Sequence, residues 1–153
     1  MKNIHIQKII KPFIFSSFLA FSLLFSSCGE DPSDPQPTVQ EQTRLILVSS
    51  PWKMTKVTVD GFDQTNVYRD LVLTFLNTQY NSVNGKGVWP ASGFWNFDNS
   101  EATAFVRSDG VRVEIQNISE SSLRLSLDWD ETTFITSGRT LSLEGQHIFE
   151  FGK

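Results

Sequence analysis

Cysteine and histidine are scarce in this sequence. Among its 153 residues there is one cysteine, Cys28, and of the two histidines only His147 lies after it. A lone cysteine cannot form an internal disulfide, and a lone histidine cannot supply the histidine cluster of a typical zinc site. The sequence therefore predicts no disulfide framework and no metal centre, and we expect no cofactor.

Local motifs that mark catalytic and phosphate-binding sites are also missing. No nucleophile elbow accompanies the serines that could pair with His147, and no glycine-rich loop could cradle a phosphate. Residues 60–66 carry many oxygen ligands but miss the spacing of a calcium loop. A strand end carries three acidic residues, Asp128, Asp130 and Glu131, and two of them could act as the carboxylate pair of a glycosidase. Acidic residues at a strand end are, however, more typical of a solvated turn. We therefore expect that the protein is not an enzyme.

Basic residues are few after Cys28. The chain holds 13 basic and 17 acidic residues, and Lys2, Lys8 and Lys11 precede the cysteine. The part that follows carries a net charge near −7, and its basic residues are scattered. An acidic surface repels phosphate backbones, so we expect no nucleic-acid partner.

The first 27 residues have the pattern of a secretory signal peptide. Three lysines precede an apolar stretch over residues 12–25 that is broken only by serine. This stretch is shorter than the ~20 residues that a helix needs to span a bilayer, and no basic cluster follows it. We therefore expect residues 1–27 to be a signal peptide rather than a transmembrane anchor.

The segment Leu24-Phe25-Ser26-Ser27-Cys28 resembles the bacterial lipobox, in which small residues precede a cysteine that becomes the new N-terminus. Ser26 and Ser27 occupy the small positions, and Phe25 stands where leucine is commonest. The resemblance implies diacylglycerol on the sulfur of Cys28, and acyl chains there would attach the protein stably to a membrane. The location that follows is the cell envelope, as an outer-membrane lipoprotein that is either periplasmic or surface-exposed.

Residues 28–42 have the composition of a linker. They are polar and contain Pro32, Pro35 and Pro37 together with Glu30, Asp31 and Asp34. Prolines stiffen a chain and deny it a regular hydrogen-bond ladder. The acidic residues after the cysteine also resemble the export signal of Bacteroidetes surface lipoproteins, and a plain solvated spacer is the alternative.

The remaining residues, 43–153, predict one β-rich domain. Residues 43–49 form an apolar run before Pro51 and predict one or two helical turns. Apolar and polar residues then alternate in about eight short runs. These predicted strands cover residues 52–59, 71–75, 79–83, 94–98, 103–107, 111–116, 123–129 and 139–151, the last bent at Gly145. The apolar phase changes between Met54 and Val57, which predicts a β-bulge.

The clearest alternation predicts which side chains face the core. We expect Leu123, Leu125, Leu127 and Trp129 to face inward and Arg124, Ser126 and Asp128 to face water. Val111, Val113 and Ile115 are expected to meet the leucines from the neighbouring strand. Consecutive strands with short turns favour an all-β fold, an antiparallel up-and-down meander of about eight strands that closes into a barrel. A two-sheet β-sandwich is the alternative.

The layout of the chain resembles that of the lipocalin-like lipoproteins of Bacteroidetes. The resemblance is carried by the lipobox, the spacer, the short helix, Trp52, Asp60-Gly61, Gly93-Phe94-Trp95-Asn96-Phe97 and Gly145-Gln146-His147-Ile148-Phe149. True lipocalins carry Gly-x-Trp on the first strand, whereas here that pattern falls in mid-chain. The resemblance implies a lipocalin-like barrel with a short N-terminal helix.

Two functions are compatible with such a barrel. Eight strands can enclose one small ligand, so the leading hypothesis is non-catalytic binding of a small apolar ligand or a glycan. Trp89, Trp95 and His147 are the candidate ligand-binding residues. The alternative is a structural or interaction subunit of an envelope complex, with a filled core that the many phenylalanines favour.

Each of these three residues also has a structural interpretation that involves no ligand. Trp89 lies in a loop rich in glycine and proline, where it could stack on a sugar or on a partner, or could plug the barrel end. Trp95 is expected in the core. His147 shares the phase of Phe149 and Phe151, so we expect it to point inward and to form one hydrogen bond.

Overall fold

The computed structural model describes residues 36–134, 137–138 and 140–153. The predicted signal peptide, Cys28 and the tether as far as residue 35 lie outside the described residues. Residues Pro37–Lys153 form one compact unit. No helix within the described ranges is both long enough and apolar enough to cross a membrane.

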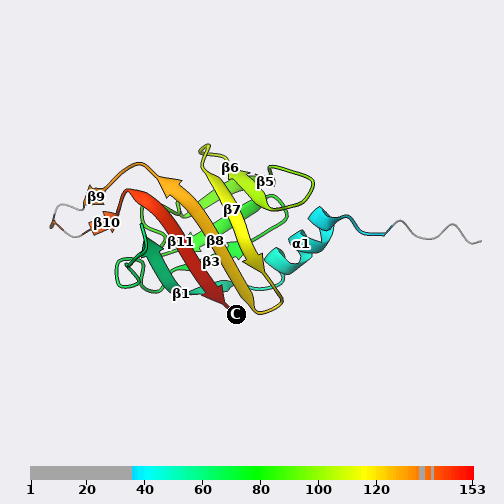
Figure 1. Ribbon diagram of the computed structural model, residues 1–153, viewed down its shortest axis with the longest axis horizontal. Coiled ribbons are helices and arrows are strands. Elements are labelled where there is room, and N and C mark those ends of the chain that lie inside the picture. Colours follow the sequence, from blue (N-terminus) through cyan, green and yellow to red (C-terminus); the bar gives the residue numbers. More distant parts are fainter. Residues whose placement is uncertain (1–35, 135–136, 139) are drawn as a thin grey trace, which may run out of the picture. The chain divides into compact units, whose positions relative to one another are not determined.

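The only helix in the described part of the chain, α1, spans Val39–Val48 (Figure 1). It begins at a capping box, in which the Thr38 hydroxyl accepts from the backbone N–H of Glu41 and the Glu41 carboxylate accepts from that of Thr38. The helix therefore starts four residues before the predicted position 43 and takes in residues assigned to the tether. Leu47 is buried and anchors the helix to the domain.

Strands make up most of the remaining described residues (Figure 1). They are β1 (Trp52–Val59), β2 (Phe62–Asp63), β3 (Val72–Phe75), β4 (Gln79–Val83), β5 (Ser92–Phe97), β6 (Ala104–Arg107), β7 (Arg112–Ile118), β8 (Ser122–Trp129), β9 (Thr133–Phe134), β10 (Thr140–Ser142) and β11 (Gly145–Gly152). The predicted strands from 52–59 to 123–129 all correspond to one of these elements.

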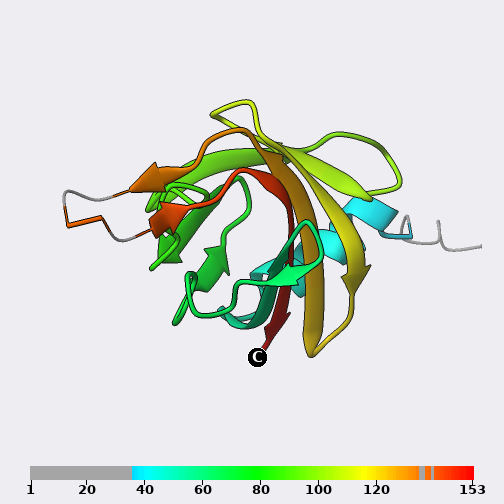
Figure 2. The same ribbon diagram turned by 60° about the vertical axis from the view of Figure 1, so that its left-hand side comes forward.

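Eight of the strands close into an antiparallel barrel. The hydrogen-bonded order is β11-β8-β7-β6-β5-β4-β3-β1, and β11 pairs with β1 to complete the ring. Figure 2 shows these strands wrapping around a common axis. The predicted all-β, lipocalin-like barrel is confirmed, and closure leaves no unpaired edge among the eight strands.

The predicted bulge in the first strand is present. The register of β1 against β11 shifts between Met54 and Lys56. The extra residue between Met54 and Lys56 shifts the inward-facing positions of the strand by one. This shift explains the phase change in the sequence, because Trp52 before the bulge and Val57 and Val59 after it are all buried.

The prediction for the end of the chain was wrong in one respect. In place of the one bent strand predicted over 139–151, the described residues form two strands, β10 and β11, and β10 pairs with β9 in a separate two-stranded sheet. The break covers the two residues after Ser142, and β11 begins at Gly145, which has φ +122° and lies against the Asp60 carboxylate. A Cβ at this position would lie 2.4 Å from Oδ2 of Asp60, so only glycine fits.

The phase predicted for β8 holds with one exception. Leu123, Leu125 and Leu127 are buried, Trp129 is partly buried, and Arg124 and Asp128 are exposed. Ser126 was expected to face water but is only 3% exposed. The register pairs Ser126 with Glu114 on β7 and with Ile148 on β11, so larger side chains flank it on the outer face of the sheet.

Large side chains fill the inside of the barrel. The fully buried ones include Trp52, Trp89, Trp95, Tyr68, Tyr80, Phe75, Phe105 and Phe149. Many meet edge to face, for example Phe75 with Trp95 at 5.6 Å and Tyr80 with Trp89 at 5.7 Å between ring centroids. A side chain with no accessible area touches neither solvent nor a void large enough for water. These rings therefore occupy the interior of the barrel.

Candidate functional site

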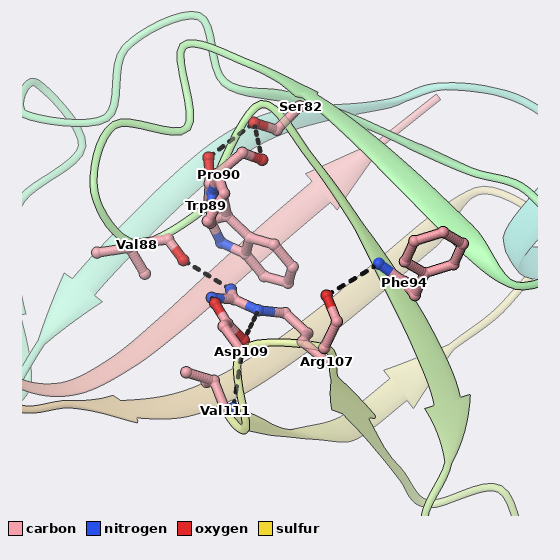
Figure 3. Close-up of polar contacts among 9 residues, drawn as sticks. Ser82, Val88, Trp89, Pro90, Phe94, Arg107, Asp109 and Val111 are labelled. Atoms are coloured by element: carbon pink, nitrogen blue, oxygen red, sulfur yellow. Dashed lines mark hydrogen bonds and ion pairs between the residues drawn. The ribbon is translucent and has the colours of Figure 1, made fainter.

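Trp89 is held inside one end of the barrel by the loop between β4 and β5. Its backbone N–H donates to Gly85 O at 2.9 Å, and the Ser82 hydroxyl donates to Trp89 O at 2.8 Å and Pro90 O at 3.0 Å (Figure 3). A Cβ at position 85 would lie 2.1 Å from Trp89 O, so the turn requires glycine there. The side chain of Trp89 is fully buried, which matches the predicted plug and not an exposed stacking surface.

Arg107 lies beneath Trp89, and its side chain is completely buried (Figure 3). The guanidinium carbon lies 4.9 Å from the centroid of the Trp89 ring. Nη1 donates to Val88 O at 2.6 Å, Nε donates to Oδ1 of Asp109 at 3.1 Å, and Nη2 pairs with the other carboxylate oxygen. This bidentate pair and the ring compensate a buried charge, so the cluster fixes the plug in place.

Asp109 is the partly exposed member of this pair. Partial burial raises its pKa, but the hydrogen bonds and the charge of Arg107 outweigh this effect, so the pKa of Asp109 lies below its ordinary value. The carboxylate is therefore ionised at neutral pH. Sequence reasoning missed the burial of Arg107, although Arg107 shares its phase along β6 with the buried Phe105.

His147 forms a fixed pair with Tyr68. Its Nδ1 lies 3.0 Å from Gly145 O, which can only accept, so Nδ1 carries the proton and Nε2 accepts from the Tyr68 hydroxyl at 2.7 Å. The backbone N–H of Leu143 donates to the same hydroxyl at 3.3 Å. His147 therefore points inward, as predicted, and both ring nitrogens are occupied.

Burial keeps both partners neutral. It lowers the pKa of His147 despite the opposing hydrogen bond to Gly145, and it raises the pKa of Tyr68 to about 12. No described serine hydrogen-bonds to the His147 ring, so the Ser-His-Asp arrangement considered from the sequence is not assembled here. The pair is a buried polar link and not an exposed base.

Trp95 belongs to the part of the core beneath α1. Its indole Nε1 donates to Leu76 O at 3.1 Å and to Gln79 O at 3.0 Å. The guanidinium carbon of Arg44, from α1, lies 4.8 Å from the ring centroid and covers it. The predicted core position of Trp95 agrees with this environment.

The three predicted residues do not form one binding site. Phe149 contacts both Trp89 and His147, at centroid distances of 5.9 and 5.5 Å. Trp95 packs instead on Phe75 and Phe105. All three side chains are buried. Trp89 and His147 line none of the depressions found along the described chain, whereas Trp95 contributes to the wall of one depression of about 330 Å³, beside Phe94 and Phe97.

The open depressions lie on the outside of the barrel. One of about 460 Å³ and one of about 620 Å³ share Asp128, Asp130 and Gln146 in their walls. We call this pair of adjoining depressions the acidic groove. Its other wall residues include Asp60, Glu114, Ser126 and Glu144, together with one cation, Arg112. The register explains the meeting of β8 and β11 here, because Asp128 lies directly opposite Gln146.

The acidic residues of the groove differ in their partners. Glu114 is paired with Arg112, and Asp109 at the rim is paired with Arg107. The carboxylates of Asp128, Asp130 and Glu144 have no ion pair or hydrogen bond with another described residue. Nowhere in the described ranges do three or more histidine, aspartate or glutamate side chains come together in a way that could hold a metal ion.

Sequence comparison with known protein families and with curated proteins finds no match. The class of the protein is therefore defined by its fold, an eight-stranded antiparallel barrel of lipocalin-like type with one short N-terminal helix. Its described features are a filled interior and an acidic groove on the outer surface.

Proposed function

We propose that this protein is a non-catalytic lipoprotein of the cell envelope that acts through the outer surface of its barrel, as an interaction subunit. One observation carries the proposal: the barrel interior is occupied by its own aromatic side chains. A small ligand would have to displace several of them, and each buried aromatic contributes about 1.5–3 kcal/mol relative to exposure. Recognition at the surface requires no such rearrangement.

The envelope location rests on the sequence. The lipobox ending at Cys28 supports lipid attachment, and the proline-containing tether supports a domain held away from the lipid. The layout that resembles Bacteroidetes lipocalin-like lipoproteins supports an outer-membrane protein, periplasmic or surface-exposed. The net negative charge supports a partner other than nucleic acid.

Binding of a small apolar ligand or glycan at the barrel mouth is the second candidate, and one observation favours it. The indole Nε1 of Trp89 is buried and has no hydrogen-bond partner in the described structure. An unpaired buried donor costs about 1–3 kcal/mol, so the plug is held less firmly than its packing implies. Opening at Trp89 would expose the ring and the aromatic core beneath it.

Two measurements on the full chain decide between the candidates. Titration of the detergent-purified protein with a dansyl-labelled C11 fatty acid should give no saturable fluorescence change. A photo-crosslinking amino acid placed at Gln146, Phe94 or Glu120, all exposed, should give a discrete product in native membranes from at least one position. Saturable binding of the fatty acid together with no product from any position would overturn the proposal.

A further inference from the structure

We propose that the outer face of strands β3 to β6 binds the same face of a second copy of this chain. The inference goes beyond the proposed surface role, because it assigns one half of the barrel wall to self-association and leaves the other half to different partners. Two features of this face carry it: its outward side chains are uncharged, and an exposed aromatic ring stands beside a hollow.

The outward side chains of β3 to β6 include no charged residue. Burial alternates along these strands, and Leu73, Tyr80 and Trp95 point into the core. We call the opposite surface the neutral face; its solvent-accessible members are Val72, Thr74, Gln79, Asn81, Val83, Ser92, Phe94, Asn96 and Val106. By contrast, the outer face of the other barrel strands carries Lys53, Lys56, Arg112, Glu114, Arg124, Asp128 and Glu150.

Strand pairing joins the members of the neutral face into one continuous surface. The pairs directly opposite each other are Val72 with Val83, Thr74 with Asn81, Asn81 with Ser92, Gln79 with Phe94, and Asn96 with Val106. Apolar area reaches solvent here, since Val83 is 59% and Phe94 54% exposed. Protein interfaces are depleted of charge at their centre and enriched in aromatic residues, and the neutral face has this composition.

The charge of the molecule favours a second copy as the occupant. The chain is acidic after Cys28, so two copies repel each other wherever their charged surfaces meet. This repulsion is smallest when the neutral faces meet. A face with charges of one sign needs a partner of opposite sign, whereas an uncharged face of amide, hydroxyl and apolar groups matches itself.

The shape of the neutral face is also self-complementary. The ring of Phe94 points away from Trp89 and Arg107 (Figure 3), and its base is fixed because the N–H of Phe94 donates to the Ser108 hydroxyl at 3.2 Å. Beside it lies a hollow of about 330 Å³, whose walls include Phe94, Asn96, Val106 and Ser108. In a two-fold pair every contact occurs twice, so the ring of each copy can enter the hollow of the other.

The charged groups at this hollow already have partners. Asp98 lies in its wall and is paired with Arg112, and the buried side chain of Arg107 is paired with Asp109. An uncharged ring that enters the hollow therefore leaves no new charge without a partner.

The size of the neutral face predicts a weak dimer. Four strands about 4.8 Å apart and at most about 20 Å long give a face of roughly 400 Å² in projection. Stable interfaces bury about 800 Å² on each partner, so we expect reversible association. A lipid at Cys28 would hold both copies on one membrane, and this confinement raises their effective concentration.

The test is photo-crosslinking in native membranes with two differently tagged forms of the full chain expressed together. p-Benzoylphenylalanine at Asn96, in the wall of the hollow, should give a product that carries both tags. The same group at Gln146, on the charged half of the wall, should give at least fivefold less of this product.

Two variants of the neutral face and one matched control complete the test. Phe94→Asp removes the ring and places like charges on both copies, so the product from Asn96 should fall at least fivefold. Asn81→Lys places a charge at an exposed polar position of the face and should cause a similar loss. Phe62→Asp makes the same change at an exposed ring outside the face and should change the yield less than twofold. All three variants should keep the urea midpoint of the unaltered protein, because each site is exposed.

Three results would overturn the proposal: no product with both tags from Asn96, equal yields from Asn96 and Gln146, or equal losses in Phe94→Asp and Phe62→Asp. A product from Asn96 that joins one copy to a different protein would assign the neutral face to that protein and would also overturn it. The surface role itself would survive any of these results if Gln146 or Glu120 gave a discrete product with another protein.

Discussion

The hydroxyl of Tyr68 donates a 2.7 Å hydrogen bond to Nε2 of His147 inside the barrel, and this bond ties the segment between β2 and β3 to the final strand. Both groups are fully buried. Their burial predicts how the stability of the domain depends on pH, because each pKa in the folded protein differs from its value in the unfolded chain.

The free energy of unfolding should change with pH in opposite directions at acid and at alkaline pH. Below an unfolded histidine pKa of about 6.5 the unfolded chain binds a proton that folded His147 resists, so the free energy of unfolding falls as pH falls. Between pH 10 and about 12 the unfolded chain loses a tyrosine proton that folded Tyr68 retains, so the free energy of unfolding falls as pH rises. Urea melts from pH 5 to pH 11.5 should show both losses.

Tyr68→Phe is the variant that isolates the pair. It leaves Nε2 of His147 and the N–H of Leu143 without this partner, so we expect a loss of about 1–3 kcal/mol at pH 7. The variant should also lose less stability above pH 10 than the unaltered protein. An identical alkaline decline in both proteins would contradict the assignment of that decline to Tyr68.

Arg107 should be far more important for stability than an exposed arginine. Arg107→Ala leaves Val88 O without its donor, leaves the Asp109 carboxylate with only the backbone N–H of Val111, and removes the cation under Trp89, so we expect a loss of about 3–5 kcal/mol in urea melts. The matched control is Arg112→Ala, whose ion pairs are exposed and should contribute at most about 1 kcal/mol. Equal losses would mean that the buried cluster does not hold the plug.

Local patterns predicted the parts of the fold that depend on local physics. Alternation with period two located most barrel strands, and the phase change after Met54 located the bulge, because a strand shows its two faces directly in the sequence. The start of α1 was predicted four residues too late, although Thr38 and Glu41 have the spacing of a capping box that marks it. The short strands β2, β9 and β10 are too brief to show a period.

The residues that meet at the candidate sites are determined by the register between paired strands. The sequence of one strand does not reveal this register. Asp128 meets Gln146 only because β8 and β11 pair with these residues opposite each other. Ser126 has the phase of a solvent-facing residue, but its flanking partners cover it. The Tyr68–His147 bond likewise joins positions 79 residues apart. Such long-range contacts follow from barrel closure and leave no local sequence signal.

Lipid attachment at Cys28 is tested by replacing the sulfur atom. Cys28→Ser removes the sulfur that would carry diacylglycerol, so the protein should move from the membrane to the soluble fraction and lose labelling by a fatty-acid analogue. The control is Ser49→Cys in the Cys28→Ser protein, because a thiol outside the lipobox should not restore labelling. Undiminished labelling of Cys28→Ser would contradict the lipobox assignment.

Leu125 and Ser126 are neighbours on opposite faces of β8, and they should respond differently to the same shortening. Leu125→Ala leaves a cavity among fully buried residues and should cost about 2–5 kcal/mol. Ser126→Ala removes a hydroxyl that has no partner among the described residues, so stability should stay within about 0.5 kcal/mol or rise slightly. A larger loss from Ser126→Ala in urea melts would mean that the strand phase is inverted.

Gly145 is the first residue of β11, and its replacement should test the close contact with Asp60. Gly145→Ala introduces a Cβ 2.4 Å from the Asp60 carboxylate at φ +122°, so clash and backbone strain should together destabilise the domain by about 2–4 kcal/mol. The control is Gly110→Ala, where φ is +86° but no atom lies within 4 Å, so strain alone should cost about 1–2 kcal/mol.

Combining Gly145→Ala with Asp60→Ala separates the two causes. The shortened side chain removes the clash but also the hydrogen bond that Asp60 accepts from the backbone N–H of Gln146 at 2.9 Å. If the clash dominates, the double variant should be less destabilised than the sum of the two single variants, by about 1–2 kcal/mol in urea melts. Strict additivity would mean that the backbone conformation of Gly145, and not the packing of Asp60, sets the cost of replacing it.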